Sequence, residues 1–384
     1  MNKTCINIVA LLFIFSILFS GCSNSRVKVN TKQDSPFYVE DEDFQNYLSN
    51  LSAMVKVKGG YYFFNDLKLY YFDIETKESY PVCNKPNCDH SSASCMAYFN
   101  LFQFYPFQLS YYKNTLYVWG WEEDGSVRHN YLYSVSLDNY KRKKAVFLFD
   151  GTSSSSIYFM IHRGYVYYIK DSGTDLKERT VYVYRAKIGD TSEKREEEAI
   201  YEFSGIGADI WGLTASGNHL FVLNSSYGDT EGNGYSTSYS MIDIHSLKSE
   251  ELIGNGAYSL FADENYVYYG KDENTINRID LTTKEEVPFC RIEGPCYISA
   301  DSNYIYFDNL QAIYIDKTDE KNRKISVYDK NGKCITNLSP KDTKDECYFG
   351  GDDYMFFKNT GTSKWYAFDK NQMVAQNKQF IDMK

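Results

Sequence analysis

Four side chains that bind soft metal ions lie close together in the sequence. They are the thiols of Cys83, Cys88 and Cys95 and the imidazole of His90. Three sulfur ligands and one nitrogen ligand suit a tetrahedral zinc site, and Pro86 with the short spacers would bend the segment so that the ligands converge. The spacing is not one of the well-defined zinc patterns. A single disulfide with one leftover thiol and a surface-exposed His90 is therefore the alternative to a structural zinc.

Four further cysteines occur as two pairs later in the chain. Cys290 precedes Cys296 by a few residues, and Cys334 and Cys347 are separated by a somewhat longer segment. In an exported protein, cysteines this close in sequence favour local disulfides that each close a short loop. We predict the bonds Cys290–Cys296 and Cys334–Cys347, which would hold neighbouring repeats in register.

The N-terminus has the features of an export signal. Lys3 precedes an apolar run of about 14 residues, shorter than the roughly 20 that a spanning helix needs. The run Leu18-Phe19-Ser20-Gly21-Cys22 then resembles a bacterial lipobox, although Phe19 departs from the Leu that is usual at its position. The resemblance implies a signal peptide over residues 1–21 and lipidation of Cys22 after cleavage. An ordinary secretory signal cut near Gly21 is the alternative, and either one exports the protein.

A lipidated Cys22 would anchor the protein to the outer face of the cell membrane. A diacylglyceryl group supplies two acyl chains, which anchor stably where a single chain binds only marginally. Residues 22–36 are mostly polar and are expected to form a tether. We expect a single folded domain over residues 37–384.

A repeat of aromatic strands predicts the fold of that domain. The chain contains 37 Tyr, 25 Phe and 4 Trp but only seven Pro, and aromatic side chains favour pleated, half-buried strands. An aromatic strand recurs seven times after a Gly, Asn or Asp turn, and a second strand follows each one. The aromatic strands are 60–64, 113–118, 164–168, 218–222, 265–269, 303–307 and 353–357. The second strands are 69–73, 131–135, 181–184, 240–244, 276–280, 325–329 and 365–369.

The polar corners of the repeat indicate antiparallel units of four strands. Several second strands end in an acid, as at Asp73, Asp280 and Asp329, and such a carboxylate closes a turn by accepting from the backbone N–H groups that follow. Units of about 40 to 50 residues are typical of propeller blades. We predict an all-β fold, a β-propeller of seven four-stranded blades in one ring, with six or eight blades as alternatives. The best helix candidate is 41–48, and most tyrosines should pack blade against blade.

The tyrosine-rich repeat resembles that of β-propeller lipoproteins of unknown function from low-GC Gram-positive anaerobes, and more distantly that of TolB-like propellers. The resemblance covers nearly the whole mature chain, and the Cys, Cys, His, Cys segment at 83–95 looks like one seen in the same lipoproteins. It implies a propeller on the outer face of the membrane and a structural purpose for the cysteine segment. It implies no known chemistry.

The sequence contains no recognisable catalytic motif, so we predict no catalytic residue. G-x-S-x-G, H-E-x-x-H, P-loop and G-x-G-x-x-G patterns are absent, and the five histidines are dispersed. The net charge of −10 disfavours nucleic acid as a partner, and the basic run 141–144 is expected to be a solvated turn. We expect a non-enzymatic binding or scaffold module for an envelope protein, a peptide or a glycan.

The alternative function is an extracytoplasmic polysaccharide hydrolase or lyase whose acids meet at the channel mouth. Inward-facing acids with Tyr or His within hydrogen-bond distance would favour the enzyme, and an apolar or filled channel would favour binding. The long glycine-rich loop at 224–240 and several tryptophans are candidates for ligand binding by aromatic stacking, with packing inside the hairpins as the alternative. The candidates are Trp119, Trp121, Trp211, Tyr227 and Tyr235.

Overall fold

The computed structural model describes residues 53–152, 158–172, 177–194, 196–256, 258–263, 265–272, 274–310, 322–343, 345–349, 351–359 and 361–383. The predicted signal peptide, Cys22, the tether and the helix candidate at 41–48 lie outside these residues. Among the described residues, no helix has both the length and the apolar character needed to cross a bilayer.

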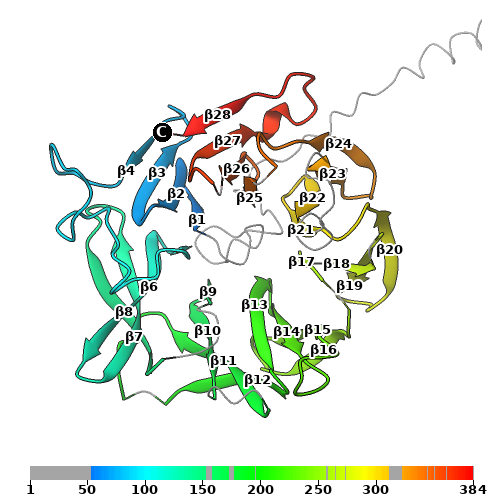
Figure 1. Cartoon of the computed structure of the whole chain (residues 1–384), viewed down its shortest axis with the longest axis horizontal. Coiled ribbons are helices and arrows are strands. Elements are labelled where there is room, and N and C mark those ends of the chain that lie inside the picture. Colours follow the sequence, from blue (N-terminus) through cyan, green and yellow to red (C-terminus); the bar gives the residue numbers. More distant parts are fainter. Residues whose placement is uncertain are drawn as a thin grey trace, which may run out of the picture. The chain divides into compact units, whose positions relative to one another are not determined.

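Seven four-stranded antiparallel sheets form a ring, which confirms the predicted seven-bladed β-propeller (Figure 1). Blade one consists of β1 (Met54–Val57), β2 (Gly60–Asn65), β3 (Lys68–Asp73) and β4 (Ser79–Pro81). Blade two consists of β5 (Ser110–Tyr112), β6 (Thr115–Asp124), β7 (Val127–Ser136) and β8 (Arg142–Asp150). Blade three consists of β9 (Phe159–His162), β10 (Tyr165–Asp171), β11 (Arg179–Lys187) and β12 (Glu198–Gly205). Blades four and five are β13 (Asp209–Ser216), β14 (His219–Ser226), β15 (Ser236–Asp243) and β16 (Ser249–Ile253); and β17 (Leu260–Ala262), β18 (Tyr266–Asp272), β19 (Thr275–Asp280) and β20 (Glu286–Arg291). Blades six and seven are β21 (Tyr297–Ala300), β22 (Tyr304–Asp308), β23 (Ile325–Asp329) and β24 (Cys334–Leu338); and β25 (Asp345–Phe349), β26 (Tyr354–Asn359), β27 (Trp365–Asp369) and β28 (Phe380–Met383), with the 3₁₀ helix η2 (Lys370–Gln372) after β27.

Each blade pairs its strands in chain order, with the first strand toward the centre of the ring and the fourth at the rim (Figure 1). Antiparallel pairing places the turn between the first and second strands on the same face as the turn between the third and fourth. We call this the lower face. The turns between second and third strands and the connections between blades lie on the opposite, upper face.

The predicted polar corners are present on the lower face. The Asp73 carboxylate accepts from the backbone N–H groups of Glu75 at 2.8 Å and Thr76 at 2.9 Å. Asp280 caps the corresponding turn of blade five, accepting from the two N–H groups at 282 and 283. These carboxylates satisfy backbone donors that a tight turn would otherwise leave without a partner.

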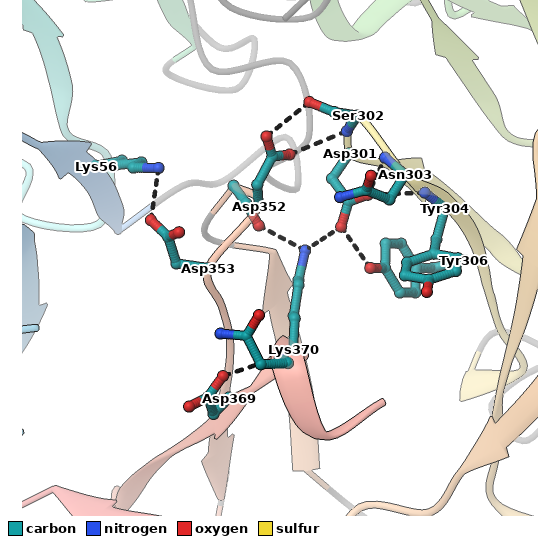
Figure 2. Close-up of polar contacts among 12 residues, drawn as sticks. Lys56, Asp301, Ser302, Asn303, Tyr304, Tyr306, Asp352, Asp353, Asp369 and Lys370 are labelled. Carbon is teal, nitrogen blue, oxygen red and sulfur yellow. Dashed lines mark hydrogen bonds and ion pairs between the residues drawn. The ribbon is translucent and has the colours of Figure 1, made fainter. Parts of the chain in front are cut away.

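The hydrophobic core lies between the blades, which confirms the prediction that most tyrosines pack there. Blade one and blade seven close the ring by side-chain packing, because each blade supplies all four of its own strands. The buried Tyr61 ring of blade one stands 4.7 Å from Phe356 of blade seven in an edge-on arrangement. At the same junction, Lys56 pairs with Asp353 at 2.8 Å (Figure 2).

Candidate functional site

The four predicted metal ligands converge in the connection between β4 and β5. Their ligand atoms all lie within 4.8 Å of one another, and His90 Nδ1 is 3.3 Å from the Cys95 sulfur. All three thiols are free in the structure. Cys83, Cys88, His90 and Cys95, which we call the Cys₃His cluster, could therefore hold a metal ion.

The backbone of this segment is turned so that the ligands face one another. Asn87 and His90 both adopt left-handed conformations, with φ of 57° and 56°. Between them, Asp89 accepts from the N–H of Ser91 at 3.2 Å and from its hydroxyl at 2.6 Å. A non-glycine residue such as His90 is uncommon in this region of φ, and such conformations often occur at ligand sites.

The segment that carries the Cys₃His cluster is attached to two blades. On the side of blade one, the N–H of Phe99 donates to the carbonyl of Leu67 at 2.8 Å. On the side of blade two, the N–H of Trp121 in β6 donates to the carbonyl of Gln103 at 2.9 Å. The Cys₃His cluster therefore lies in a connection that is hydrogen-bonded to both blades.

Arg142 is a neighbour of the cluster that the sequence analysis missed. Its guanidinium donates to the carbonyls of Met96 at 2.5 Å and Tyr98 at 2.7 Å, and it stacks 3.7 Å from the Phe99 ring. Burial lowers the pKa of Arg142 to about 10, and its charge interacts with Cys95. The prediction of a turn is wrong for residues 142–144, which belong to β8. The expected solvation also fails for Arg142, because its long side chain reaches the connection. Its positive charge would offset part of the negative charge of bound thiolates.

The four other cysteines among the described residues are free thiols in the structure, which joins neither Cys290 to Cys296 nor Cys334 to Cys347. Cys290 lies on β20 and Cys334 on β24, which are rim strands, whereas Cys347 lies on β25 and Cys296 directly before β21, which are inner strands. The short segments between these cysteines therefore run from the rim of one blade to the centre of the next. Burial raises the pKa of the Cys290 thiol to about 12, so this thiol stays protonated at neutral pH.

Three of the five predicted ligand-binding aromatics meet on the upper face of blade four. Trp211, Tyr227 and Tyr235 are 47%, 40% and 46% exposed. The Tyr235 ring contacts both of the others, with its centroid 5.8 Å from that of Trp211 and 5.6 Å from that of Tyr227. We call these three residues the aromatic surface.

A β-bulge turns Trp211 outward. In the pairing of β13 with β14, Ile210 lies opposite Asn224 and Gly212 lies opposite Leu223, so Trp211 is an extra residue without a partner in the register. A bulge of this kind bends the strand and redirects the extra side chain. Trp211 is thereby exposed, although it belongs to an inner strand.

Local hydrogen bonds hold the two tyrosines at the two ends of the loop between β14 and β15. Asp229 accepts from the N–H of Glu231 at 3.0 Å and from the N–H and side chain of Asn233 at 2.9 and 3.0 Å. Hydrogen bonds from Asn233 hold the pKa of Asp229 below its usual value. Beneath Tyr227, Gly207 has a φ of +58°, and a Cβ at this position would lie 2.6 Å from the tyrosine ring. These contacts define the conformation in which the loop presents its two tyrosines.

The other two candidates, Trp119 and Trp121, lie on β6 of blade two and do not join the aromatic surface. Trp119 is fully buried and donates from Nε1 to the side-chain oxygen of Asn130 at 3.2 Å. The guanidinium of Arg128 lies 4.8 Å from the Trp121 ring and covers it. Trp119 is therefore a core residue, and the prediction of a ligand-binding role for it is not supported by its position.

A buried ion pair joins blades six and seven on the lower face (Figure 2). The Lys370 ammonium donates to the Asp301 carboxylate at 2.7 Å and to the carbonyl of Gly351 at 2.6 Å, and the Tyr306 hydroxyl donates to the same carboxylate. Burial raises the pKa of Asp301, but the Lys370 ammonium, the Tyr306 hydroxyl and the backbone N–H of Tyr304 together outweigh burial and hold the pKa below its usual value. Next to this pair, Asp352 accepts from the Ser302 hydroxyl at 2.6 Å.

Two more buried acids have partners inside the protein. Asp345 accepts from the Tyr366 hydroxyl and from the Asn359 amide at 2.9 Å, and Asp308 forms an ion pair with Arg323. Acids with a tyrosine within hydrogen-bond distance are thus present, as a polysaccharide hydrolase or lyase would require. However, Asp301, Asp308 and Asp345 are at most 3% exposed and bind internal donors, so they stabilise the packing and do not face a substrate.

Comparisons with known proteins show distant structural similarity. No protein-family model matches the chain, and no curated protein matches it. The computationally designed Ika8 protein is 12% identical, with a TM-score of 0.45 over 83% of this chain and 95% of that chain. Oligogalacturonate lyase in complex with manganese is 9% identical, with a TM-score of 0.44 over 82% of each chain. BamB from Moraxella catarrhalis is 7% identical, with a TM-score of 0.41 over 87% and 85%. TM-scores this low assign no function to this chain.

Proposed function

We propose that this protein is an exported, lipid-anchored propeller that binds an envelope component without catalysis. The observation that carries the proposal is the aromatic surface, in which three half-exposed rings lie together and Tyr235 contacts both Trp211 and Tyr227. Binding residues are often found on loops that a rigid scaffold positions. Exposed rings that are ordered before binding also lose little side-chain entropy when a ligand covers them.

The arrangement of the acids supports binding over hydrolysis or elimination. A general acid or base must reach the reacting atoms of its substrate. The three most buried carboxylates described above instead accept from lysine, arginine, tyrosine or amide donors within the blades. We therefore do not propose the polysaccharide hydrolase or lyase.

The double variant Trp211→Ala/Tyr235→Ala is expected to bind Gram-positive cell-envelope fragments about tenfold or more weakly than the wild type. Truncating central aromatic contacts commonly costs more than 1 kcal/mol each, and 1.4 kcal/mol is a tenfold change in affinity. The measurement is cosedimentation of the processed protein, purified in detergent, with washed envelope fragments over a range of concentrations.

Tyr80→Ala is the matched control for this experiment. Tyr80 is 47% exposed and also contacts another ring, that of Tyr71, but it lies on the rim strand of blade one. We expect this variant to bind envelopes like the wild type. Equal binding by the double variant and the control would show that the aromatic surface is not the binding site.

We propose zinc as the metal of the Cys₃His cluster, with a structural role. Three thiolates and one imidazole are a common ligand set for structural zinc. The residues fit this ion because the four ligand atoms are already within 4.8 Å of one another. Burial raises the pKa of the Cys95 thiol to about 11, so binding of the ion as a thiolate complex would release a proton from this residue.

Cys22→Ala is expected to move the protein from the membrane fraction to the culture medium of a Gram-positive host. Without the thiol no diacylglyceryl group can be attached, and the two acyl chains supply the stable anchoring. Fractionation and immunoblotting of the full-length chain measure the effect, with Cys334→Ala as a control that keeps the lipobox. A Cys22→Ala variant that stays in the membrane fraction would contradict lipidation.

A further inference from the structure

The chemistry of the aromatic surface indicates which class of envelope component it binds. The faces of Trp and Tyr rings carry partial negative charge. The axial C–H bonds of a pyranose whose substituents are equatorial form an apolar, slightly positive face. Such a sugar stacks on an aromatic ring and leaves its hydroxyl groups free for water and for polar neighbours.

The spacing of the rings suits a chain of sugars. The three centroids follow one another at 5.8 and 5.6 Å, and neighbouring rings are tilted by 41° and 53°. Each ring can therefore contact a different sugar of a chain that twists along its length.

The charges beside the surface disfavour an anionic ligand. Asp209 lies on β13 near Trp211, and Asp229 lies in the loop between the two tyrosines. The nearby Arg179 is held by Asp171 at 2.7 Å and lies 3.9 Å from Asp209, so its charge is offset by two acids. With a net charge of −10 over the chain, a polyanion would be repelled.

The size of the surface also favours a glycan over a folded protein. A stable protein interface buries roughly 800 Å² on each partner and includes some 20 to 30 residues. The aromatic surface consists of one strand residue and the two ends of a single loop. Three rings at successive distances of 5.8 and 5.6 Å are better matched to one extended polymer chain.

We infer that the aromatic surface of Trp211, Tyr227 and Tyr235 binds an uncharged glycan built of β-linked pyranoses with equatorial substituents. This inference rests on the proposed function, since it names the ligand class of the same site. The loop between β14 and β15 then acts as a positioning element, in which Asp229 sets the distance between the two tyrosines.

The test uses two neutral probes, hydroxyethylcellulose and the N-acetylated chitin hexasaccharide, with polygalacturonate as the anionic comparison. Affinity electrophoresis of the processed protein in detergent gives the Kd for the polymers, and tryptophan fluorescence follows the hexasaccharide. We expect binding to at least one neutral probe and none to polygalacturonate. Trp211→Ala and Tyr235→Ala should each weaken binding about tenfold, while Tyr80→Ala should leave the Kd unchanged.

Substitutions at Asp229 test its positioning role separately. Asp229→Ala removes the acceptor of three hydrogen bonds and is expected to weaken neutral-glycan binding roughly threefold, because the loop must then be ordered on binding. Asp229→Asn keeps a side-chain oxygen for the backbone N–H groups and should restore most of the affinity. Equal affinities for all three proteins would contradict the role assigned to Asp229.

Failure of the inference can be distinguished from failure of the proposed function. If neither neutral probe binds but the double variant still loses envelope binding, the ligand is a protein or peptide and the inference is wrong. Preference for polygalacturonate would also overturn it. If neither neutral probe binds and the double variant also keeps envelope binding, both the inference and the proposed function are wrong.

Discussion

Replacement of Lys370 by methionine is expected to lower the free energy of unfolding by about 3–5 kcal/mol at pH 7. The Lys370 ammonium lies 2.7 Å from Asp301, and both side chains are almost inaccessible to solvent. Without this cation, the Asp301 carboxylate stays buried and has lost the ammonium that neutralises its negative charge. Urea unfolding followed by tyrosine and tryptophan fluorescence measures the loss.

The effect of this variant should also depend on pH. In the wild type the pKa of Asp301 is below its ordinary value. The ionised Asp301 carboxylate therefore contributes to stability above about pH 4, and this contribution is lost as the pH falls. In Lys370→Met the Tyr306 hydroxyl still donates to Asp301, but the largest opposing interaction is gone, so burial raises this pKa relative to the wild type and protonation of Asp301 in acid relieves the cost. The difference in stability between wild type and variant should therefore be largest near neutral pH and shrink below about pH 4.

Lys284→Met is the matched control. Lys284 of blade five pairs with Glu250 of blade four, also at 2.7 Å and also between blades, but the two side chains are 46% and 54% exposed. An exposed pair contributes about 1 kcal/mol or less. If both variants lost the same stability, burial would not be the reason for the effect, and our account of the Asp301–Lys370 pair would be wrong.

One equivalent of zinc per chain is the expected result of elemental analysis on the processed protein. Cys88→Ser should reduce the zinc content to near zero, because removal of one thiolate from a closed four-ligand site leaves it incomplete. Free zinc at 100 times its Kd would stabilise the native state by roughly 2.7 kcal/mol. Chelation should therefore lower the urea midpoint of the wild type and leave that of Cys88→Ser unchanged.

Cys334→Ser tests the specificity of this result, because Cys334 is an exposed thiol on a rim strand and lies outside the cluster. It should keep one equivalent of zinc. Absence of metal in the wild type, together with two fewer free thiols than in the reduced protein, would support the disulfide alternative for Cys83, Cys88 and Cys95. Iron or copper in place of zinc would confirm a metal site but contradict our choice of ion.

The strands and their repeat were predictable because both depend on local sequence. The predicted strand at 60–64 corresponds to β2 (Gly60–Asn65), and the acid at Asp73 closes its turn as expected. Side chains alternate along a strand and turns need particular residues, so these features are written in neighbouring positions. The convergence of Cys83, Cys88, His90 and Cys95 was accessible for the same reason, since all four lie in one connection.

The amino-acid sequence alone thus determined the four-stranded repeat that builds the ring and the composition of the Cys₃His cluster, with seven blades as the leading prediction. Only the tertiary structure decided which distant residues meet. Asp301 and Lys370 pair across 69 positions, Arg142 reaches back to the cluster, and a bulge exposes Trp211 while Trp119 is buried. These outcomes depend on the register between strands and on the distance of each strand from the centre of the ring. A one-residue change in register reverses the direction of a side chain without altering the local pattern that predicts a strand.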